Sequence, residues 1–282
     1  MKIVIKFAGA LLEDGETVRS LAAQVASLAA DGHQILVVHG GGRIFTTTLK
    51  RLGIESRFVA GLRVTDRETR DVAVMVFAGL LNKQLAAAIS SAGQPAVGIS
   101  AADAQCFRAE PLVHNDVPGG LGYVGYLTGA NIDLLESFWT QGLLPVAACL
   151  GMGSDGELYN INADHMAAAC AEYLQADQLI YLTDVQGVLD RERVLSAVAC
   201  DQVEQLVQAK VVSGGMVLKL EAARRALEGG VAVVHIVGGT APNGLLTAVR
   251  ALADGRSAFS ATIPGTRVVR QAMAIPAALT AA

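Results

Sequence analysis

Short runs of β-branched and apolar residues alternate with longer amphipathic segments, and this alternation constrains the fold more than any other feature of the chain. Runs of the first kind are found at 2–7, 34–42, 95–100, 143–151, 177–185 and 231–239. Helical spacing of apolar residues lies between them, at 16–32, 67–92, 130–142, 163–175, 201–210 and 215–229. Apolar strands separated by amphipathic helices are typical of a parallel sheet with both faces covered. The sequence therefore predicts an α/β fold.

Two segments interrupt this alternation. Residues 104–128 are rich in Gly, Pro and Tyr, and the stretch 122–129 is compatible with an antiparallel hairpin. Residues 151–161 also read as a hairpin, with Asp155 and Gly156 at its turn. The uncharged segment after Arg270 is compatible both with disorder and with packing on the surface.

Composition narrows the class of protein. The chain has 282 residues, 52% of them hydrophobic and 17% charged, which indicates a globular protein with a sizeable core. A net charge of −4 favours neither nucleic acid nor a membrane surface as a partner. The sequence has no signal-peptide pattern and no uninterrupted apolar run of roughly 18 residues, so we expect a cytoplasmic protein. Its four cysteines and five histidines form no metal-binding motif, and we expect no metal held by protein ligands alone.

Polar residues and glycines gather where predicted strands end and helices begin. The sequence HGGG (39–42) follows a strand, and its N–H groups suit an anion. A tight turn needs only one glycine, so the three glycines favour an anion site. In NINAD (160–164), helix capping explains Asn162, and the helix dipole explains Asp164 in the first turn. Capping does not explain Asn160, so this segment also suggests a polar site.

Two lysines far apart in the chain fit the same site. Lys6 ends the first strand, and Lys219 lies just past the first turn of a helix, where a cation opposes the helix dipole but suits a bound phosphate. Asp184 follows another buried strand. Because ligands bind at the carboxyl edge of open α/β sheets, these residues can converge there. The sequence therefore indicates an enzyme that handles phosphate groups.

The ordered set of motifs resembles the acetylglutamate kinases of the amino acid kinase superfamily. It consists of K-x-x-G (6–9), HGGG (39–42), GLRVT (61–65), NINAD (160–164), LTDVQGV (182–188) and SGGMVLK (213–219). The resemblance covers residues 1–267 and implies an open αβα sandwich with a mainly parallel sheet and two lobes. It implies that 1–176 binds the acyl acceptor and dimerises, that 177–267 binds ATP, and that 268–282 is a tail.

The resemblance also implies roles for individual residues. Lys6 and Lys219 would stabilise the transferring phosphoryl group, and Asp164 would hold both lysines. The expected ligands of N-acetyl-L-glutamate are Gly41, Gly42, Arg63 and Asn160, with Arg63 on the α-carboxylate. Those of the nucleotide are Gly9, Asp184, Val185, Gln186, Gly187, Val188, Leu189, Val211, Val212 and Ser213.

The implied reaction is ATP-dependent phosphorylation of the side-chain carboxylate of N-acetyl-L-glutamate, a step of arginine biosynthesis. A carboxylate with a usual pKa of about 4.3 is already ionised at neutral pH, so no general base is required. Mg²⁺ would be held mainly by phosphates and water. Three alanines, Ala8, Ala101 and Ala104, replace glycines of the family pattern. Ala8 raises the question of whether its methyl group crowds the phosphate.

Two other functions stay open at this point. One is a related kinase acting on another carboxylate, such as a carrier-linked aminoadipate; the other is an inert kinase-like domain that senses a ligand. Aspartate and glutamate 5-kinases usually carry further C-terminal domains. Family members inhibited by arginine carry an additional N-terminal helix, so we expect a homodimer with little arginine feedback. Binding of a PII-type regulator is undetermined.

Overall fold

The computed structural model describes residues 1–59, 61–113, 120–253 and 264–271, and an eight-stranded sheet forms its centre. In spatial order the strands are β14 (Ala197–Ala199), β16 (Thr266–Val269), β15 (Val233–Gly238), β11 (Gln178–Thr183), β1 (Lys2–Phe7), β2 (Gln34–His39), β8 (Leu144–Ala148) and β5 (Ala96–Ile99). All neighbouring strands are parallel except β15 and β16. The predicted α/β fold with a mainly parallel sheet is confirmed.

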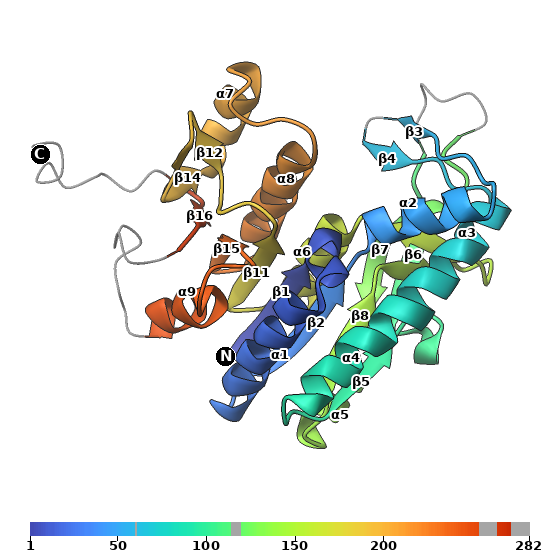
Figure 1. Cartoon of the computed structure of the whole chain (residues 1–282), viewed down its shortest axis with the longest axis horizontal. Coiled ribbons are helices and arrows are strands. Elements are labelled where there is room, and N and C mark those ends of the chain that lie inside the picture. The colour runs from blue at the N-terminus through green and yellow to red at the C-terminus, as the bar shows by residue number, and fades with distance from the viewer. Residues whose placement is uncertain (60, 114–119, 254–263, 272–282) are drawn as a thin grey trace, which may run out of the picture.

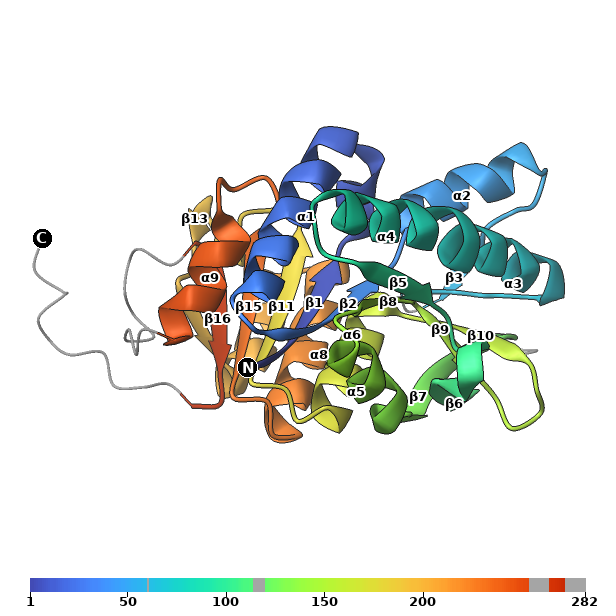
Figure 2. The same cartoon turned by 90° about the horizontal axis from the view of Figure 1, so that it is seen from below.

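Helices cover both faces of this sheet (Figures 1 and 2). One face carries α1 (Gly15–Ala30), α4 (Asn82–Ser91) and α9 (Gly244–Ala253). The other carries α5 (Ile132–Thr140), α6 (Ala163–Tyr173) and α8 (Gly215–Glu228). Side chains supplied by the sequence fix several helix starts: Asp14 accepts a hydrogen bond from Thr17 N–H, and Asn162 from the N–H groups of Asp164 and His165.

Side chains on the two faces of β1 pack into two different hydrophobic clusters, and this alternation determines the direction of Lys6. Ile3, Ile5 and Phe7 are fully buried and pack into the cluster under α1 and α9. Val4 packs into the other cluster, which includes the buried residues of α6 and α8. Since side chains alternate along a strand, Lys6 follows Val4 onto the face covered by α6 and α8. The strand's period therefore determines which helices the lysine meets.

A small closed barrel stands beside the sheet. It consists of β6 (Phe107–Pro111), β7 (Val124–Ala130), β9 (Leu150–Met152) and β10 (Leu158–Ile161). The predicted hairpin at 151–161 is confirmed, because β9 and β10 pair antiparallel around Asp155 and Gly156. The hairpin considered within 122–129 is wrong: that stretch contributes one strand, whose antiparallel partner is β6. Gly125 there allows close packing against Tyr159, where a Cβ would lie 2.8 Å from the tyrosine Cβ.

The predicted helix at 67–92 is one long helical segment with a π-helical middle. It comprises α3 (Arg67–Val74), the π-helical turn η2 (Met75–Leu81) and α4. By length and composition this 25-residue segment could cross a bilayer, since an 18-residue window within it has a mean hydropathy of 1.7. Half of its most apolar window is buried within the protein, as in the core helix of a globular domain.

The remaining elements are short. They are η1 (Gly9–Glu13), α2 (Gly42–Arg51), β3 (Phe58–Val59), β4 (Leu62–Arg63), η3 (Asp103–Gln105), β12 (Leu189–Asp190), β13 (Arg193–Val194), η4 (Cys200–Gln202) and α7 (Val203–Gln208). The predicted helix at 201–210 is thus a 3₁₀ turn followed by a short α-helix. The strand β16 continues to Val269, past the tail boundary expected at 268. Most of that tail, 272–282, lies outside the described residues.

Of the three alanines that replace family glycines, Ala104 has an unfavourable backbone conformation. Its φ of 50° and ψ of 31° place it in the left-handed region, which its Cβ disfavours. Ala101, by contrast, is fully buried and belongs to the core. The replacement at 104 therefore costs folding free energy.

We expect Ala104→Gly to raise the free energy of unfolding by about 1 kcal/mol, because it removes this steric cost. Urea denaturation measures the change. Ala102→Gly is the matched control, since Ala102 lies in the same exposed loop with an ordinary helical φ of −67°. The control should lose stability through the flexibility of unfolded glycine. Equal effects of the two substitutions would contradict the explanation.

Candidate active site

Three charged residues from three elements meet beyond the carboxyl end of β1. The Nζ atoms of Lys6, from β1, and Lys219, from α8, each lie 2.8 Å from the same atom, Oδ1 of Asp164 in α6. All three residues are at most 9% exposed. The hydroxyl of Tyr181 donates to the backbone carbonyl of Asp164 at 3.1 Å, and the Lys219 ammonium lies 4.9 Å from the centre of its ring. The sequence-predicted lysines and their carboxylate are thus brought together.

This arrangement moves the pKa values of two of its members. Burial acts to raise the pKa of Asp164, but the charges and hydrogen bonds of Lys6 and Lys219 outweigh it and lower the pKa to about 2. Burial, followed by repulsion from Lys6, lowers the pKa of Lys219 to about 8. The depressed carboxyl pKa means that these ion pairs stabilise the fold above pH 3.8 and lose that contribution as the pH falls toward 2.

A buried histidine holds the glycine turn at the edge of the site. The imidazole of His39 is fully buried, with Nδ1 2.9 Å from the Gly40 carbonyl and Nε2 3.2 Å from the amide nitrogen of Asn82. Burial lowers the pKa of His39 to about 4, so the ring is neutral at physiological pH. A Cβ on Gly41 would lie 2.1 Å from a methyl group of the buried Leu81, so a larger residue there would require Leu81 to move. The HGGG turn is therefore fixed by contacts on both sides.

The turn after Lys6 approaches this glycine turn closely. A Cβ on Gly9 would lie 2.8 Å from Cα of Gly41 and 2.9 Å from the nitrogen of Gly42. Ala8, in contrast, has an extended backbone, with φ −67° and ψ 141°, and its methyl group packs against the α1 side of the core. Glycine is thus required at position 9 but not at position 8.

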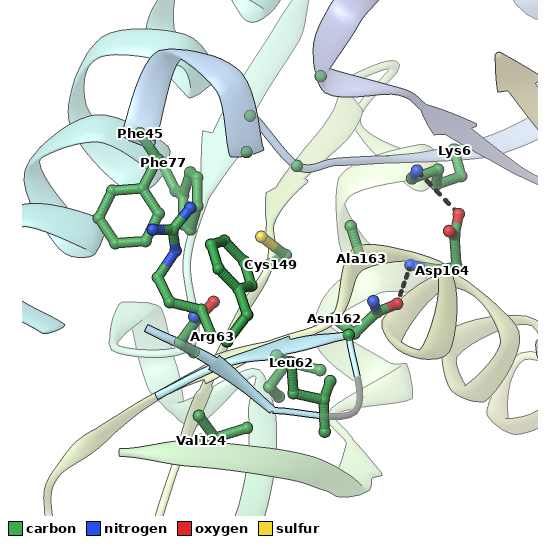
Figure 3. A pocket seen from close by; sticks show the side chains of 18 residues that line it. Lys6, Phe45, Leu62, Arg63, Phe77, Val124, Cys149, Asn162, Ala163 and Asp164 are labelled. Atoms are coloured by element: carbon green, nitrogen blue, oxygen red, sulfur yellow. Dashed lines mark hydrogen bonds and ion pairs between the residues drawn. The ribbon is translucent and has the colours of Figure 1, made fainter. Parts of the chain in front are cut away.

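A pocket of about 220 Å³ extends from Lys6 and Asp164 into the N-terminal half of the chain (Figure 3). It is lined by Lys6, Gly9, Gly40, Gly41, Gly42, Phe45, Phe58, Gly61, Leu62, Arg63, Phe77, Val124, Cys149, Asn160, Ile161, Asn162, Ala163 and Asp164. All four residues predicted to bind the acceptor line it, together with Gly9, Lys6 and Asp164.

Arg63 is the cation at the far end of this pocket (Figure 3). It is 8% exposed, and its guanidinium lies 4.6 Å from the ring centre of Phe45 and 4.5 Å from that of Phe58. It donates to the hydroxyls of Ser56 and Thr46. Burial lowers its pKa from the usual value, and within the described chain no carboxylate lies within 4 Å of it. A buried guanidinium paired only with hydroxyls and rings is suited to an anionic ligand.

Two further polar residues line the pocket. The amide nitrogen of Asn160, at the parallel pairing of β10 with β7, donates to the Thr65 hydroxyl at 3.2 Å. Burial raises the pKa of the Cys149 thiol to about 12, so Cys149 is a neutral wall of the pocket and not a nucleophile. The asparagine amide retains hydrogen-bonding capacity for a ligand in the pocket.

The residues predicted to bind the nucleotide surround the carboxyl end of β11. Asp184 faces Arg43 across the edge of the sheet at 3.4 Å, and Val185 and Leu189 are exposed. Val188 is different: its side chain is fully buried, its N–H donates to the Thr266 hydroxyl at 2.8 Å, and its carbonyl accepts from Leu195. We therefore interpret Val188 as an anchor of the loop and not as a direct ligand.

The other predicted nucleotide residues are more varied in position. Gln186 lines a separate cavity of about 510 Å³ beside the loop after β15. Gly187 has a φ of 156°, and a Cβ there would lie 2.7 Å from the Thr266 hydroxyl. Val211 and Ser213 precede α8, and Val212 between them is buried.

Several residues of the site were not identified from the sequence. These are Thr46, Ser56, Phe45, Phe58, Phe77, Cys149 and Tyr181. Tyr181 directly precedes LTDVQGV, Phe45 follows HGGG by three residues, and Phe58 precedes GLRVT by three residues. Phe77 and Cys149 carry no local signal. Among the described residues, no group of three or more His, Cys, Asp or Glu side chains is placed to hold a metal ion.

Comparison with known proteins agrees with this geometry. Residues 1–238 match the amino acid kinase family. The chain belongs to the amino acid kinase family. An acetylglutamate kinase of Koribacter versatilis is 51% identical over 243 residues, which are 85% of this chain and 91% of that protein. An acetylglutamate kinase of Acidobacterium capsulatum is 48% identical over 84% of this chain and 90% of that protein. The resemblance stated from the motifs is confirmed.

Solved structures of the amino acid kinase fold are similar in shape. N-acetylglutamate synthase of Neisseria gonorrhoeae, complexed with coenzyme A and N-acetyl-glutamate, superposes with a TM-score of 0.82 at 25% identity. That match covers 96% of this chain and 60% of the synthase chain. Giardia carbamate kinase superposes with a TM-score of 0.64 at 17% identity and shares the fold alone.

The conformation of Ala8 leads to a prediction about this kinase. We expect Ala8→Gly to leave kcat unchanged within about twofold, because the methyl group packs away from the site, and to lower the free energy of unfolding by about 0.5–1 kcal/mol. Steady-state kinetics and urea denaturation measure the two effects. A large gain in kcat would mean that Ala8 crowds the phosphate.

The lowered pKa of Lys219 predicts how activity depends on pH. If the charged ammonium is required, kcat/KM for ATP should fall as the pH rises through about 8, the pKa in the free enzyme. The value of kcat should stay constant up to a higher pH than kcat/KM does, because bound phosphates favour the charged form of Lys219. Rates between about pH 6.5 and pH 10 measure both profiles, and a flat kcat/KM would contradict the role of Lys219.

A control measurement distinguishes loss of the Lys219 charge from unfolding as the cause of lost activity. The stability contributed by Lys219 should rise with pH, whereas the activity should fall. Between about pH 8 and the usual lysine value of 10.5, the unfolded chain binds more protons at Lys219 than the folded protein does. This group therefore contributes increasing stability as the pH rises through that window. Thermal unfolding measured in the same buffers separates loss of the charge from loss of the fold.

Proposed function

We propose that this kinase transfers the γ-phosphoryl group of ATP to the side-chain carboxylate of N-acetyl-L-glutamate, giving N-acetyl-L-glutamyl 5-phosphate for arginine biosynthesis. One observation carries the proposal: a single pocket has Arg63 at one end, buried and with no carboxylate partner among the described residues, and Lys6 at the other, where Lys6 shares Asp164 with Lys219. A ligand with two carboxylates can therefore bind Arg63 with one and present the other to Lys6. The relatives that match this chain over most of their length bear the name of that activity.

In this mechanism the acceptor carboxylate attacks the γ-phosphorus as the bond to the β-phosphate oxygen breaks, and ADP leaves. The attacking oxygen carries no proton, which agrees with the absence of a charged histidine in the described pocket lining. Lys6 and Lys219 donate hydrogen bonds to the phosphoryl oxygens, where negative charge is spread in the transition state. Asp164 fixes both ammonium groups before the substrates bind. The N–H groups of Gly9 and Gly42 orient the oxygens.

Mg²⁺ is proposed as the accompanying ion. When bound with ATP it neutralises charge on the β- and γ-phosphates. Asp164 and Asp184 are two carboxylates whose charges act on Lys219. Asp164 is already shared by two lysines, so Asp184 is the carboxylate available to the ion or its water ligands.

We also propose a cytoplasmic homodimer. Met75 and Leu80 of η2 are large apolar side chains that are 59% and 49% exposed, and a second copy of the chain would cover them. A mass by light scattering of about twice the 29.2 kDa chain tests this assignment.

The proposed function is tested by trapping the acyl phosphate as a hydroxamate with a panel of carboxylate acceptors. We expect product with N-acetyl-L-glutamate and far less with glutamate, aspartate or N-acetylated aminoadipate. Preference for another carboxylate would identify the related kinase considered from the sequence. Binding of N-acetyl-L-glutamate without turnover would identify a ligand-sensing domain.

Substitutions at the two ends of the pocket should affect different kinetic constants. Lys6→Ala and Lys219→Ala should lower kcat on the order of 10²-fold, because each removes charge that stabilises the transition state. Arg63→Lys should mainly raise KM for the acceptor, since a point charge does not replace the planar fork. Initial rates at varied acceptor and ATP concentrations separate the effects. A near-normal kcat in either lysine variant would refute the role of that lysine.

A further inference from the structure

Arg70 is a buried, ion-paired arginine of α3 that the proposed mechanism does not use. It is 7% exposed, and Nη2 lies 2.7 Å from Oδ1 of Asp71 while Nη1 donates to Glu157. Its guanidinium carbon lies 4.5 Å from the ring centre of Tyr123. This one group therefore joins α3, the turn between β9 and β10, and the segment before β7.

Two of these partners lie directly beside a pocket residue. Glu157 immediately precedes β10, the strand that carries Asn160. The Tyr123 carbonyl accepts a hydrogen bond from the Asn160 N–H at 2.8 Å. Arg70 thus contacts the chain on both sides of the parallel pairing that places Asn160 at the pocket.

The contacts continue from Tyr123 to the arginine of the pocket. The Tyr123 N–H donates to the Thr65 carbonyl at 2.6 Å. The Thr65 hydroxyl donates to the Arg63 carbonyl at 2.9 Å and accepts from the Asn160 amide at 3.2 Å. Thr65 is fully buried, so this hydroxyl has no contact with solvent. A continuous set of contacts therefore runs from Arg70 to both polar residues of the acceptor pocket.

We propose that Arg70 is a positioning residue for the acyl acceptor: by holding Tyr123 and the β9–β10 turn, it sets the places of Asn160 and Arg63. The inference rests on the proposed function of those two residues as acceptor ligands. Arg70 itself does not line the pocket, and it lies away from the lysine pair. Its effect is thus confined to the acceptor and does not extend to ATP.

The test compares Arg70→Met with the wild-type enzyme. Methionine keeps a long apolar stem and removes the planar fork. KM for N-acetyl-L-glutamate should rise on the order of tenfold, while KM for ATP and kcat stay within about twofold. Arg70→Lys should be intermediate, because it keeps the charge but not the stacked plane. A merely structural loss would reduce the folded fraction and leave both KM values unchanged.

Two controls sharpen the result. Arg250→Met removes an arginine that pairs with Asp31 at 2.8 Å in the distant contact between α9 and α1, and it should change neither KM. In an Asn160→Ala background, Arg70→Met should add little to the acceptor KM, because contacting residues are not additive. If Arg70→Met does not fold, Arg70→Lys and Glu157→Gln provide the same readout.

Three outcomes would overturn the inference: an unchanged acceptor KM in folded Arg70→Met, equal rises in both KM values, or full additivity with Asn160→Ala. Failure of the proposed function is distinguishable from failure of this inference, because it would be seen in the acceptor preference of the wild-type enzyme. If the wild-type enzyme phosphorylates another carboxylate, the same comparison applies to that acceptor. Calorimetric binding of the acceptor provides a readout that does not require turnover.

Discussion

The Asp164 carboxylate lies between the ammonium groups of Lys6, from β1, and Lys219, from α8, and the candidate site depends on it. Two buried cations that share one carboxylate oxygen repel each other. One carboxylate oxygen at 2.8 Å from each offsets that repulsion. Tyr181 fixes the backbone of Asp164 from β11, so α6, β1, β11 and α8 are joined at one point. Without this carboxylate, Lys6 and Lys219 would not share a site.

Backbone packing forms the second wall of the site, and it decides where glycine is required. The turn at Gly9 approaches the backbone of Gly41 and Gly42 so closely that a Cβ on Gly9 would clash, whereas a Cβ on Gly41 would meet the side chain of Leu81. His39, buried and neutral, holds the second turn through its hydrogen bond to Gly40. The methyl group of Ala8 points into the core on the opposite side. A glycine-poor version of the first turn is therefore compatible with the same close approach.

The acceptor end of the pocket differs from the lysine end, because its cation is held by rings and hydroxyls and not by a carboxylate. Arg63 is buried between aromatic rings and hydroxyls, so its charge is available to an anion. The Thr65 hydroxyl joins Arg63 to Asn160, and Tyr123 joins them to Arg70. Rigid placement of these groups reduces the entropy lost when a small, flexible diacid binds. In the proposed mechanism the lysine end of the pocket stabilises the transferring phosphoryl group, and the arginine end positions the acceptor.

The sequence by itself determined six strands of the central sheet, most helices, the Asn162 cap and the glycine turns, whereas β14 and β16 were not predicted. The predicted elements depend on periodicity or on hydrogen bonds within a few residues. The family resemblance implied that Asp164 holds both lysines. Tertiary structure alone decided that Ser56 and Thr46 hold Arg63 and that Val188 faces the core. It also decided the direction of the Ala8 methyl group. Strand order and register determine these contacts, and no local pattern encodes them.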